Sequence, residues 1–176
     1  MTKRGVFIGR FQPFHKGHLN VVERILSEME ELIIVIGSSQ ISHRITDPFT
    51  AGERILMIKT ALKKAGIEMS RCWIIPVPDV NIHKLWVSQI INYVPGFIRV
   101  YSNEPLTCRL FIEEGFEVDP APFYEREIYS ATEVRNRIFN GENWEELVPE
   151  SVSQIIKDID GIERMRALIK TDKRSI

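Results

Sequence analysis

The residues with the clearest chemical potential lie near the start of the chain, in the stretch GRFQPFHKGHL from Gly9 to Leu19. His15 and His18 are three residues apart, so on the first turn of a helix both rings can face one side. Arg10 can approach the same point from the preceding strand. Three donors can then converge on one anion, and we call these three residues the anion clamp. Two histidines that only cap the helix or lie at the surface are the simpler alternative.

The anion clamp needs a strand before it and a helix after it. Residues 6–8 form a short apolar run, and the apolar residues of 19–29 are spaced by three and four, which is typical of a helix. In open α/β sheets, ligands bind beyond the carboxyl ends of the strands. A helix that begins near Gly17 directs free backbone N–H groups and its positive dipole end at this loop, which favours a phosphate. Gly17 would let the backbone approach that phosphate closely.

The rest of the chain repeats this order of strand and helix. We expect strands at residues 6–8, 32–36, 72–77, 97–101 and 116–118, and helices at 19–29, 51–65, 85–94 and 105–114. The alternation predicts an α/β fold with a doubly wound, Rossmann-like parallel sheet and right-handed crossovers. From Ser130 onward the apolar spacing is helical only. We therefore expect one domain over residues 1–176, with a Rossmann-like core at about 1–129 and a C-terminal helical cap at 130–176.

Length and composition are those of a globular protein. The 176 residues are 44% hydrophobic and 27% charged, and the formal net charge of −1 provides no global field for nucleic acid. No segment approaches the roughly 20 apolar residues of a membrane span, and the apolar run after Lys3 and Arg4 is too short for a signal peptide. We therefore expect a cytoplasmic protein that binds neither membrane nor nucleic acid.

Other kinds of site lack their motifs. The sequence contains no Walker A motif, GxGxxG fingerprint, HExxH motif or EF-hand loop, which argues against P-loop kinases, NAD-dependent dehydrogenases and zinc proteases. His43 and His83 have no carboxylate or cysteine partners at ligand spacing, so we expect no zinc site. Cys72 and Cys108 stand far apart in apolar segments, which indicates ordinary buried thiols.

The stretch GRFQPFHKGHL resembles the HxGH signature of the nucleotidyltransferase superfamily, which includes the adenylyltransferases and the class I aminoacyl-tRNA synthetases. YSATEVRNR, at residues 129–137, resembles the second signature of that superfamily, ISxTxxR. With DPFTAGER at 47–54, PVPDV at 76–80 and LWVS at 85–88, the chain is similar to the archaeal type of nicotinamide-nucleotide adenylyltransferase. The resemblance implies transfer of AMP from ATP to nicotinamide mononucleotide, giving NAD and pyrophosphate, with Mg²⁺ held mainly by substrate phosphates.

The same resemblance implies roles for the residues on the ATP side. His15 and His18 would contact the ATP phosphates near the reacting centre, and His18 would stabilise the transition state. Arg10 and Arg135 would hold the β and γ phosphates, so that the implied catalytic residues are His15, His18 and Arg135. Two further donors, Ser130 and Thr132, stand at a predicted helix start, where simple helix capping is the alternative.

On the acceptor side, the resemblance implies that the nicotinamide ring stacks on Trp86 and that its carboxamide N–H binds Asp79. Both roles fit the chemistry, because an indole face attracts a cationic pyridinium ring and a carboxylate accepts from an amide. The alternatives are a core tryptophan and a turn aspartate. Family members commonly form homo-oligomers, hexamers among them, and the sequence does not decide whether nicotinate mononucleotide is also used.

Two stretches depart from the family pattern. Thr46 stands where some relatives carry a phosphate-binding arginine, and Arg44 lies two residues earlier. YSNEP at residues 101–105 replaces an expected SGNP, which removes a glycine. Two rival functions also remain: an adenylyltransferase for another phosphate acceptor such as phosphopantetheine, and a non-catalytic nucleotide-binding regulatory module.

Overall fold

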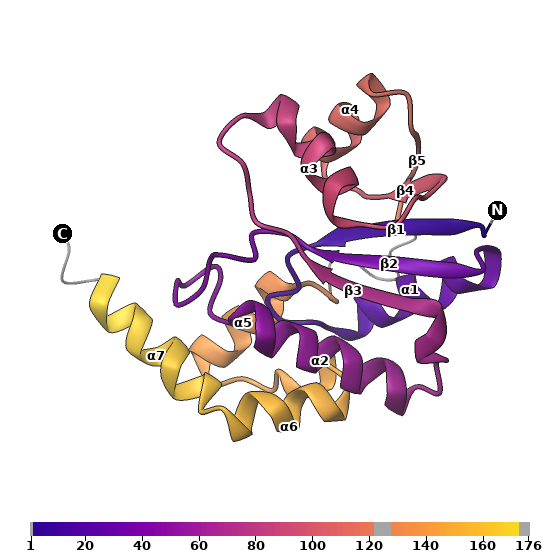
Figure 1. Cartoon of the computed structure of the whole chain (residues 1–176). Helices are drawn as coiled ribbons and strands as arrows, with labels where there is room; N and C mark the ends of the chain where they lie inside the picture. Colours follow the sequence, from indigo (N-terminus) through magenta and orange to yellow (C-terminus); the bar gives the residue numbers. More distant parts are fainter. Residues whose placement is uncertain (1, 122–127, 173–176) are drawn as a thin grey trace.

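The apolar runs of the sequence form a five-stranded parallel sheet (Figure 1). The computed structural model describes residues 2–121 and 128–172 of the chain. The strands are β1 (Arg4–Gly9), β2 (Glu31–Ile36), β3 (Cys72–Pro76), β4 (Arg99–Tyr101) and β5 (Glu117–Asp119). Their order across the sheet is β3-β2-β1-β4-β5, and every pair is parallel. The predicted doubly wound, Rossmann-like sheet is confirmed.

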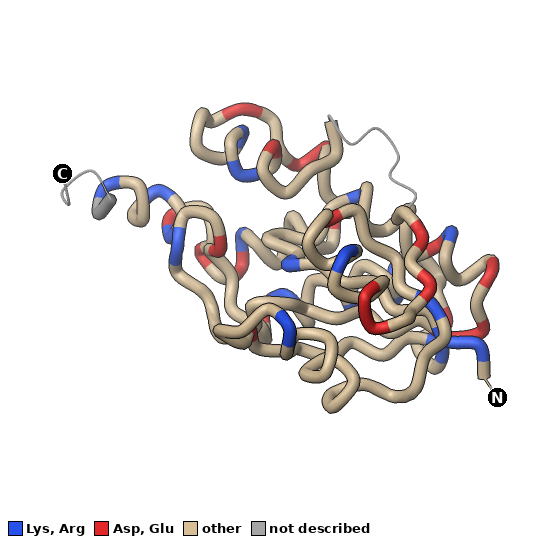
Figure 2. Tube along the Cα trace, turned by 90° about the horizontal axis from the view of Figure 1, so that it is seen from above, with Lys and Arg blue, Asp and Glu red and all other residues tan. Residues whose placement is uncertain are grey.

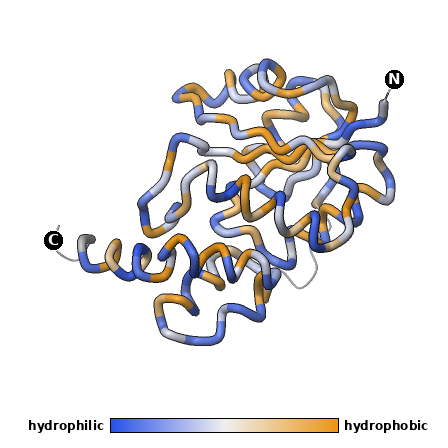
Figure 3. Tube along the Cα trace, turned by 60° about the horizontal axis from the view of Figure 1, so that its bottom comes forward, coloured by the Kyte–Doolittle hydropathy of each residue, from blue (hydrophilic) through white to orange (hydrophobic). Residues whose placement is uncertain are grey.

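Helices cover both faces of this sheet, as Figure 1 shows. The helices between strands are α1 (Lys16–Glu28), α2 (Ala51–Lys64), α3 (Trp86–Tyr93) and α4 (Pro105–Glu113). Strand β2 shows how two hydrophobic layers arise from one run: Leu32 and Ile34 pack with the α1 and α2 side, whereas Ile33 and Val35 pack with the α3 and α4 side. All of these side chains are buried, because helices cover a parallel sheet from both sides. In Figure 3 the most hydrophobic part of the trace lies in these central strands.

The C-terminal segment adds α5 (Ala131–Asn140), α6 (Glu150–Asp158) and α7 (Gly161–Asp172). Short 3₁₀ turns lie at Met69–Arg71, His83–Leu85 and Glu145–Leu147. Helix α6 packs against α2, and α7 packs against α5 and α6, so the three helices share one hydrophobic cluster with α1 and α2. The predicted C-terminal helical cap is confirmed, while the division of a single domain near residue 129 stays a prediction.

Two predicted strands begin later than expected. Phe97 and Phe116 precede β4 and β5 instead of opening them, and their rings stack with centroids 4.9 Å apart. Both rings also pack against Phe111 of α4. The aromatic residues that suggested strand starts therefore belong to the packing of α4 beside the sheet, which a strand pattern alone does not reveal.

Charged residues of both signs are interspersed along the trace (Figure 2), in keeping with the net charge of −1. Several of them form exposed ion pairs within one helix, such as Arg109 with Glu113, which contribute little to stability. Among the residues that the structure describes, no helix has both the length and the apolar character that crossing a membrane requires. An anion site on this protein must therefore be built locally.

Gly9, the last residue of β1, provides a test of the packing that leads into the anion clamp. A Cβ atom at Gly9 would lie 2.9 Å from the ring of Phe11, which is 1% exposed and has a φ of 53°. Because that ring is enclosed, we expect Gly9→Ala to lower the free energy of unfolding by about 1–3 kcal/mol. Urea denaturation measures this, with Gly52→Ala as the control.

A Cβ atom at Gly52, in the first turn of α2, would meet nothing within 4 Å. We expect Gly52→Ala to change the free energy of unfolding by about 1 kcal/mol or less, in the stabilising direction. Equal stability of Gly9→Ala and the unchanged protein would contradict the prediction.

Candidate active site

Two hollows open at the carboxyl ends of the strands, and Arg10 lines both. The histidine hollow has a volume of about 190 Å³ and is lined by Arg10, Phe11, Gln12, His15, His18, Tyr129, Ser130, Ala131, Thr132 and Arg135. The tryptophan hollow, about 500 Å³, is lined by residues 8–10, Gly37, Ser38, Asp79, Val80, His83, Trp86, Ser102, Glu104, Leu106, Thr107 and Leu110. Every residue predicted to bind a substrate lines one of the two. Another cavity, between α2 and α6, contains none of them.

His15 and His18 cap the start of α1 reciprocally. The backbone N–H of His18 donates to Nδ1 of His15 at 3.3 Å, and the backbone N–H of His15 donates to Nδ1 of His18 at 3.3 Å. The two rings stack with their centroids 3.5 Å apart. The capping alternative therefore describes part of their role, but both rings also line the hollow, so capping and anion binding are compatible.

These hydrogen bonds determine which donor each ring can present. A neutral ring whose Nδ1 accepts a hydrogen bond carries its proton on Nε2. Burial lowers the pKa of His15 to about 3, and burial together with the neighbouring His15 ring lowers the pKa of His18 well below its usual value. Both rings are thus neutral at neutral pH. They can offer Nε2–H donors to an anion without a positive charge of their own.

Aromatic rings fix the position of His18. The ring of Phe11 meets it edge-on at 4.8 Å, and the ring of Phe14 stacks on it at 5.5 Å. Gly17 serves the same packing, because a Cβ there would lie 3.0 Å from the His15 ring and 3.0 Å from Cβ of Tyr129. The glycine therefore makes room for side chains of the site, and the close backbone approach to phosphate that the sequence suggested stays a prediction.

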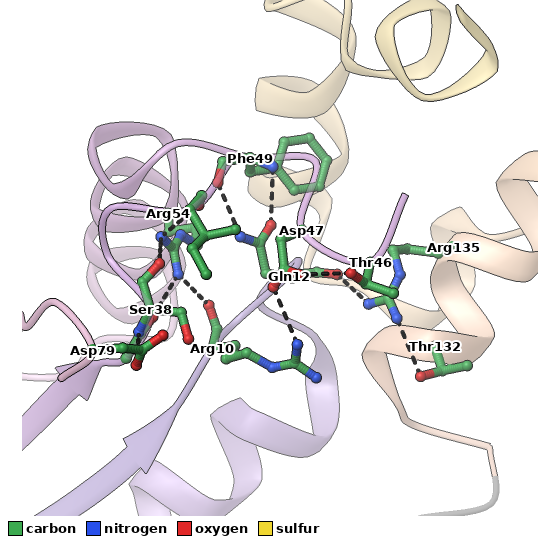
Figure 4. Close-up of polar contacts among 12 residues, drawn as sticks. Arg10, Gln12, Ser38, Thr46, Asp47, Phe49, Arg54, Asp79, Thr132 and Arg135 are labelled. Atoms are coloured by element: carbon green, nitrogen blue, oxygen red, sulfur yellow. Dashed lines mark hydrogen bonds and ion pairs between the residues drawn. The ribbon is translucent and has the colours of Figure 1, made fainter. Parts of the chain in front are cut away.

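Positive charge in the histidine hollow comes from two arginines (Figure 4). The Arg10 side chain is 58% exposed, and its Nη1 lies 3.2 Å from Oδ1 of Asp47. Arg135, only 8% exposed, donates to the carbonyl of Gln12 at 2.7 Å and to Oγ1 of Thr132 at 3.3 Å. Burial and the charge of Arg10 lower the pKa of Arg135, but a guanidinium remains protonated at neutral pH.

The start of α5 also faces the histidine hollow. Oγ of Ser130 accepts the backbone N–H of Glu133 at 3.1 Å, which makes Ser130 the N-cap of this helix. Thr132 holds Arg135, as described above. Ser130 therefore caps the helix, as the alternative proposed, whereas Thr132 contacts a side chain of the site instead. The role of the two residues toward ATP stays a prediction.

Asp79 and Trp86 come together in the tryptophan hollow from the loop after β3 and the first turn of α3. Oδ1 of Asp79 accepts the backbone N–H of Ser38 at 3.2 Å, and Oε1 of Gln40 accepts the backbone N–H of Asp79 at 3.0 Å. Trp86 is half-buried and packs against the hydrophobic cluster beneath α3 and α4 while it lines the hollow. The core alternative for Trp86 is thus compatible with a face open to ligand.

The two departures from the family pattern have structural consequences. Thr46 donates to Oδ2 of Asp47 at 2.6 Å, whereas Arg44 is exposed and lines neither hollow.

In YSNEP, Glu104 is the N-cap of α4 and accepts the backbone N–H of Thr107, while Ser102 accepts the N–H of Glu104. Burial by itself would raise the pKa of Glu104, but hydrogen bonds from Thr107 and from the backbone of Leu106 lower it, so the tryptophan hollow contains a carboxylate there.

Sequence reasoning missed several residues that build the site. Gln12 is 2% exposed, donates to the carbonyl of Phe49 and accepts the N–H of Phe49, both at 2.9 Å. His83 lines the tryptophan hollow beside Trp86. Arg54 is fully buried in the first turn of α2. Arg54 is the last residue of DPFTAGER, a stretch shared with the family, which could have marked it as important. A single arginine on a helix, however, normally lies on an exposed face.

Comparison with known sequences gives consistent matches. Residues 6–137 match the cytidylyltransferase-like family. The chain is 50% identical over 169 residues to a nicotinamide-nucleotide adenylyltransferase of Methanosarcina acetivorans, covering 96% of each chain. It is 49% identical to the protein of that name from Methanothrix thermoacetophila, covering 97% of this chain and 98% of the relative. A protein of the same name from Saccharolobus solfataricus is 46% identical, with 97% of this chain and 99% of the relative covered.

Solved structures share the fold. A bifunctional NMN adenylyltransferase/ADP ribose pyrophosphatase of Francisella tularensis, crystallised with AMP and a manganese ion, superposes with a TM-score of 0.78 at 26% identity. The match covers 99% of this chain and 54% of the Francisella chain, so this chain spans about half of that protein. A nicotinate-nucleotide adenylyltransferase structure from Vibrio parahaemolyticus, at 18% identity and a TM-score of 0.61, shows likeness of fold alone.

The buried histidines generate a prediction about stability and pH. Below about pH 6.5 the unfolded chain binds protons at histidines that stay neutral in the folded protein, so the free energy of unfolding falls as pH falls. Each buried histidine contributes a slope of about 1.4 kcal/mol per pH unit. Urea denaturation between about pH 7 and about pH 5 measures this slope, because most carboxylates titrate at lower pH and do not contribute there.

We expect His15→Asn to lower the slope, because asparagine can cap the helix but does not titrate. His43→Asn is the matched control, since His43 is exposed and has a φ of 56°, which asparagine tolerates. An unchanged slope in His15→Asn would show that His15 is protonated in the folded protein.

Proposed function

The chain belongs to the cytidylyltransferase-like family and, within it, to the nicotinamide-nucleotide adenylyltransferases, and we infer that it transfers AMP from ATP to nicotinamide mononucleotide. The products are NAD and pyrophosphate, which makes the reaction a step of NAD biosynthesis. The observation that carries the inference is the pair of hollows that share Arg10 as a lining residue. One hollow offers donors for phosphates, and the other offers an indole ring and a carboxylate.

The reaction requires little covalent chemistry from the protein. An oxygen of the mononucleotide phosphate attacks the α-phosphorus of ATP, and the bond to the β-phosphate oxygen breaks, so the electron pair leaves on pyrophosphate. The second pKa of a phosphate monoester is about 6, so the nucleophile is already ionised and needs no general base. The protein must hold two anions in line and stabilise the charge that moves between them.

We assign the ATP phosphates to the histidine hollow. Nε2–H of His15 and His18 would donate near the α-phosphate, with His18 stabilising the charge that develops in the transition state. Arg10 and Arg135 would hold the β and γ phosphates. Because both imidazoles are neutral, each keeps Nδ1 as an acceptor for the backbone and donates through Nε2–H, and these hydrogen bonds can strengthen as charge develops. The start of α5, with Ser130 and Thr132, adds backbone donors on the same side.

We assign the nicotinamide to the tryptophan hollow. The pyridinium ring would stack on Trp86, and Asp79 would accept the carboxamide N–H. The backbone N–H of Ser38 holds Oδ1 of Asp79, and Asp79 lines the hollow, so its carboxylate would be the acceptor offered to the carboxamide. The carboxylate of nicotinate mononucleotide would instead meet the Asp79 carboxylate. This favours the amide substrate.

The divalent metal is expected to arrive with ATP. Among the residues that the structure describes, no group of three or more His, Cys, Asp or Glu side chains could hold a metal ion. Mg²⁺ prefers oxygen ligands and keeps several waters, so ATP phosphates and water can supply most of its ligands. Its charge would help to neutralise the phosphates. Manganese in the Francisella structure supports a divalent ion of this kind. A cytoplasmic location and a homo-oligomer such as a hexamer stay predictions.

Pyrophosphate release from ATP and Mg²⁺ tests the function directly. The acceptors to compare are nicotinamide mononucleotide, nicotinate mononucleotide, phosphopantetheine and none. We expect strong release with nicotinamide mononucleotide, NAD as its product, and weaker release with the nicotinate compound. Release with phosphopantetheine alone would indicate the other adenylyltransferase, and ATP binding without release would indicate a regulatory module.

Trp86→Ala tests the assignment of the tryptophan hollow. We expect KM for nicotinamide mononucleotide to rise about tenfold, because a ring–cation contact is lost, with little change in KM for ATP. Trp73→Ala is the matched control, since Trp73 is 43% exposed on the edge strand β3 and lines neither hollow. Equal increases in both KM values for Trp86→Ala would indicate a packing role instead.

A further inference from the structure

Arg54 is a fully buried guanidinium whose hydrogen-bond acceptors, among the described residues, are all backbone carbonyls. Its Nη1 donates to the carbonyls of Arg10 at 2.9 Å and Gly37 at 3.0 Å. Its Nη2 donates to the carbonyls of Ser38 at 3.1 Å and Ile41 at 3.5 Å. Its Nε donates to the carbonyl of Thr50 at 3.3 Å, so five N–H donors meet five acceptors. Figure 4 shows Arg54 between Arg10 and Ser38.

A buried charge of this kind is costly unless it is well compensated. Burial lowers the pKa of Arg54, and the more distant carboxylates of Asp47 and Asp79 act in the opposite direction. A methionine or leucine could fill similar space without that cost. What the guanidinium adds, and an apolar side chain would not, is hydrogen bonds to three chain segments. They are the end of β1, the end of β2 and the loop up to residue 50.

The peptide between Gly37 and Ser38 connects Arg54 to the acceptor side of the site. The C=O and N–H groups of a trans peptide point in opposite directions. Its carbonyl accepts from Arg54 at 3.0 Å, and its N–H donates to Oδ1 of Asp79 at 3.2 Å. A donor on the carbonyl polarises the peptide and strengthens the bond that its N–H makes. The position of Asp79 thus depends on Arg54 through a single peptide group.

The second connection is to the ATP side. Arg54 holds the carbonyl of Arg10, whose own side chain lines both hollows. Arg10 follows directly after β1, and the ladder pairing of the described strands ends at Gly9, one residue before it. A fixed carbonyl there restricts the direction in which the Arg10 side chain departs. One buried residue therefore contacts the backbone that presents a predicted ligand for each substrate.

We propose that Arg54 is a positioning residue that aligns Arg10 toward ATP and Asp79 toward nicotinamide mononucleotide. The proposal rests on the substrate assignment made above. Arg54 lines neither hollow, so it acts through the backbone that it binds: directly on Arg10, and on Asp79 through the peptide between Gly37 and Ser38.

Arg71 is a matched control for Arg54. It also donates to three backbone carbonyls, those of Leu26, Met29 and Glu30, at 2.7 to 2.8 Å. These carbonyls lie where α1 ends and β2 begins, at the amino end of the sheet and away from both hollows. Arg71→Gln should therefore lower stability through the same kind of lost contact without a change in either KM.

The test is a double-mutant cycle on KM for nicotinamide mononucleotide, with Arg54→Gln, Asp79→Asn and the two combined. We expect Arg54→Gln to raise KM for both substrates about tenfold. For nicotinamide mononucleotide, we expect the rise in KM of the double variant to be about threefold or more smaller than the product of the rises in the two single variants. The shortfall arises because Asp79 is no longer oriented once Arg54 is lost. In the parallel cycle with Arg71→Gln and Asp79→Asn, the change in KM of the double variant should equal the product of the changes in the two single variants. Thermal melts identify the temperature at which every variant is folded.

Each contrary outcome is distinct. Multiplicative effects in the Arg54 cycle, or unchanged KM values in a folded Arg54→Gln protein, would overturn the positioning role. Should Arg54→Gln not fold, Arg54→Lys keeps the charge with fewer donors and completes the same cycle, with a smaller expected rise in KM. Failure of the unchanged protein to form NAD would instead overturn the proposed function, and calorimetric titration with ATP would then still report whether Arg54→Gln weakens ATP binding.

Discussion

The backbone polar groups at the carboxyl ends of β1 and β2 constrain the whole site. Where the chain leaves a parallel sheet, its carbonyl and N–H groups lose their ladder partners, and buried ones must be satisfied by other donors and acceptors. This protein satisfies them with side chains. Arg54 binds carbonyls of both strand ends, Gln12 pairs with the backbone of Phe49, and His15 and His18 cap α1. These side chains therefore satisfy and hold the backbone of the loops that border the two hollows.

This arrangement would separate the two tasks of the proposed phosphate binding. The histidines use Nδ1 for the backbone and are held neutral by burial, so they contribute oriented N–H donors. Arg10 and Arg135 contribute charge, one from a largely exposed position and the other from a buried one. Neutral donors beside charged ones avoid the repulsion that two stacked imidazolium rings would suffer, and they leave the field of the site to the arginines.

The C-terminal helices are joined to the same network. Arg135 of α5 reaches the carbonyl of Gln12, and Arg164 of α7 binds both carboxylate oxygens of Glu53 and the carbonyl of Pro48. Glu53 also accepts the backbone N–H of Thr50 in the capping box of α2. Because these contacts converge on the segment before α2, the helical cap supports the loop that Gln12 and Arg54 hold from the other side. The cap is thus part of the site's construction.

Periodicity and short motifs are local properties of the chain, so the sequence alone predicted the order of strands and helices, the two signatures and the candidate ligand residues of both hollows. It did not predict the contribution of Gln12 or His83. Two strands were predicted to begin at Phe97 and Phe116, which was wrong, because both rings pack against Phe111 of α4. Only the tertiary structure decided that both histidines are neutral, that Gly17 makes room for a ring, and that Arg54 is buried. Burial, pKa and hydrogen-bond partners depend on residues brought together from distant parts of the chain, and no local pattern encodes them.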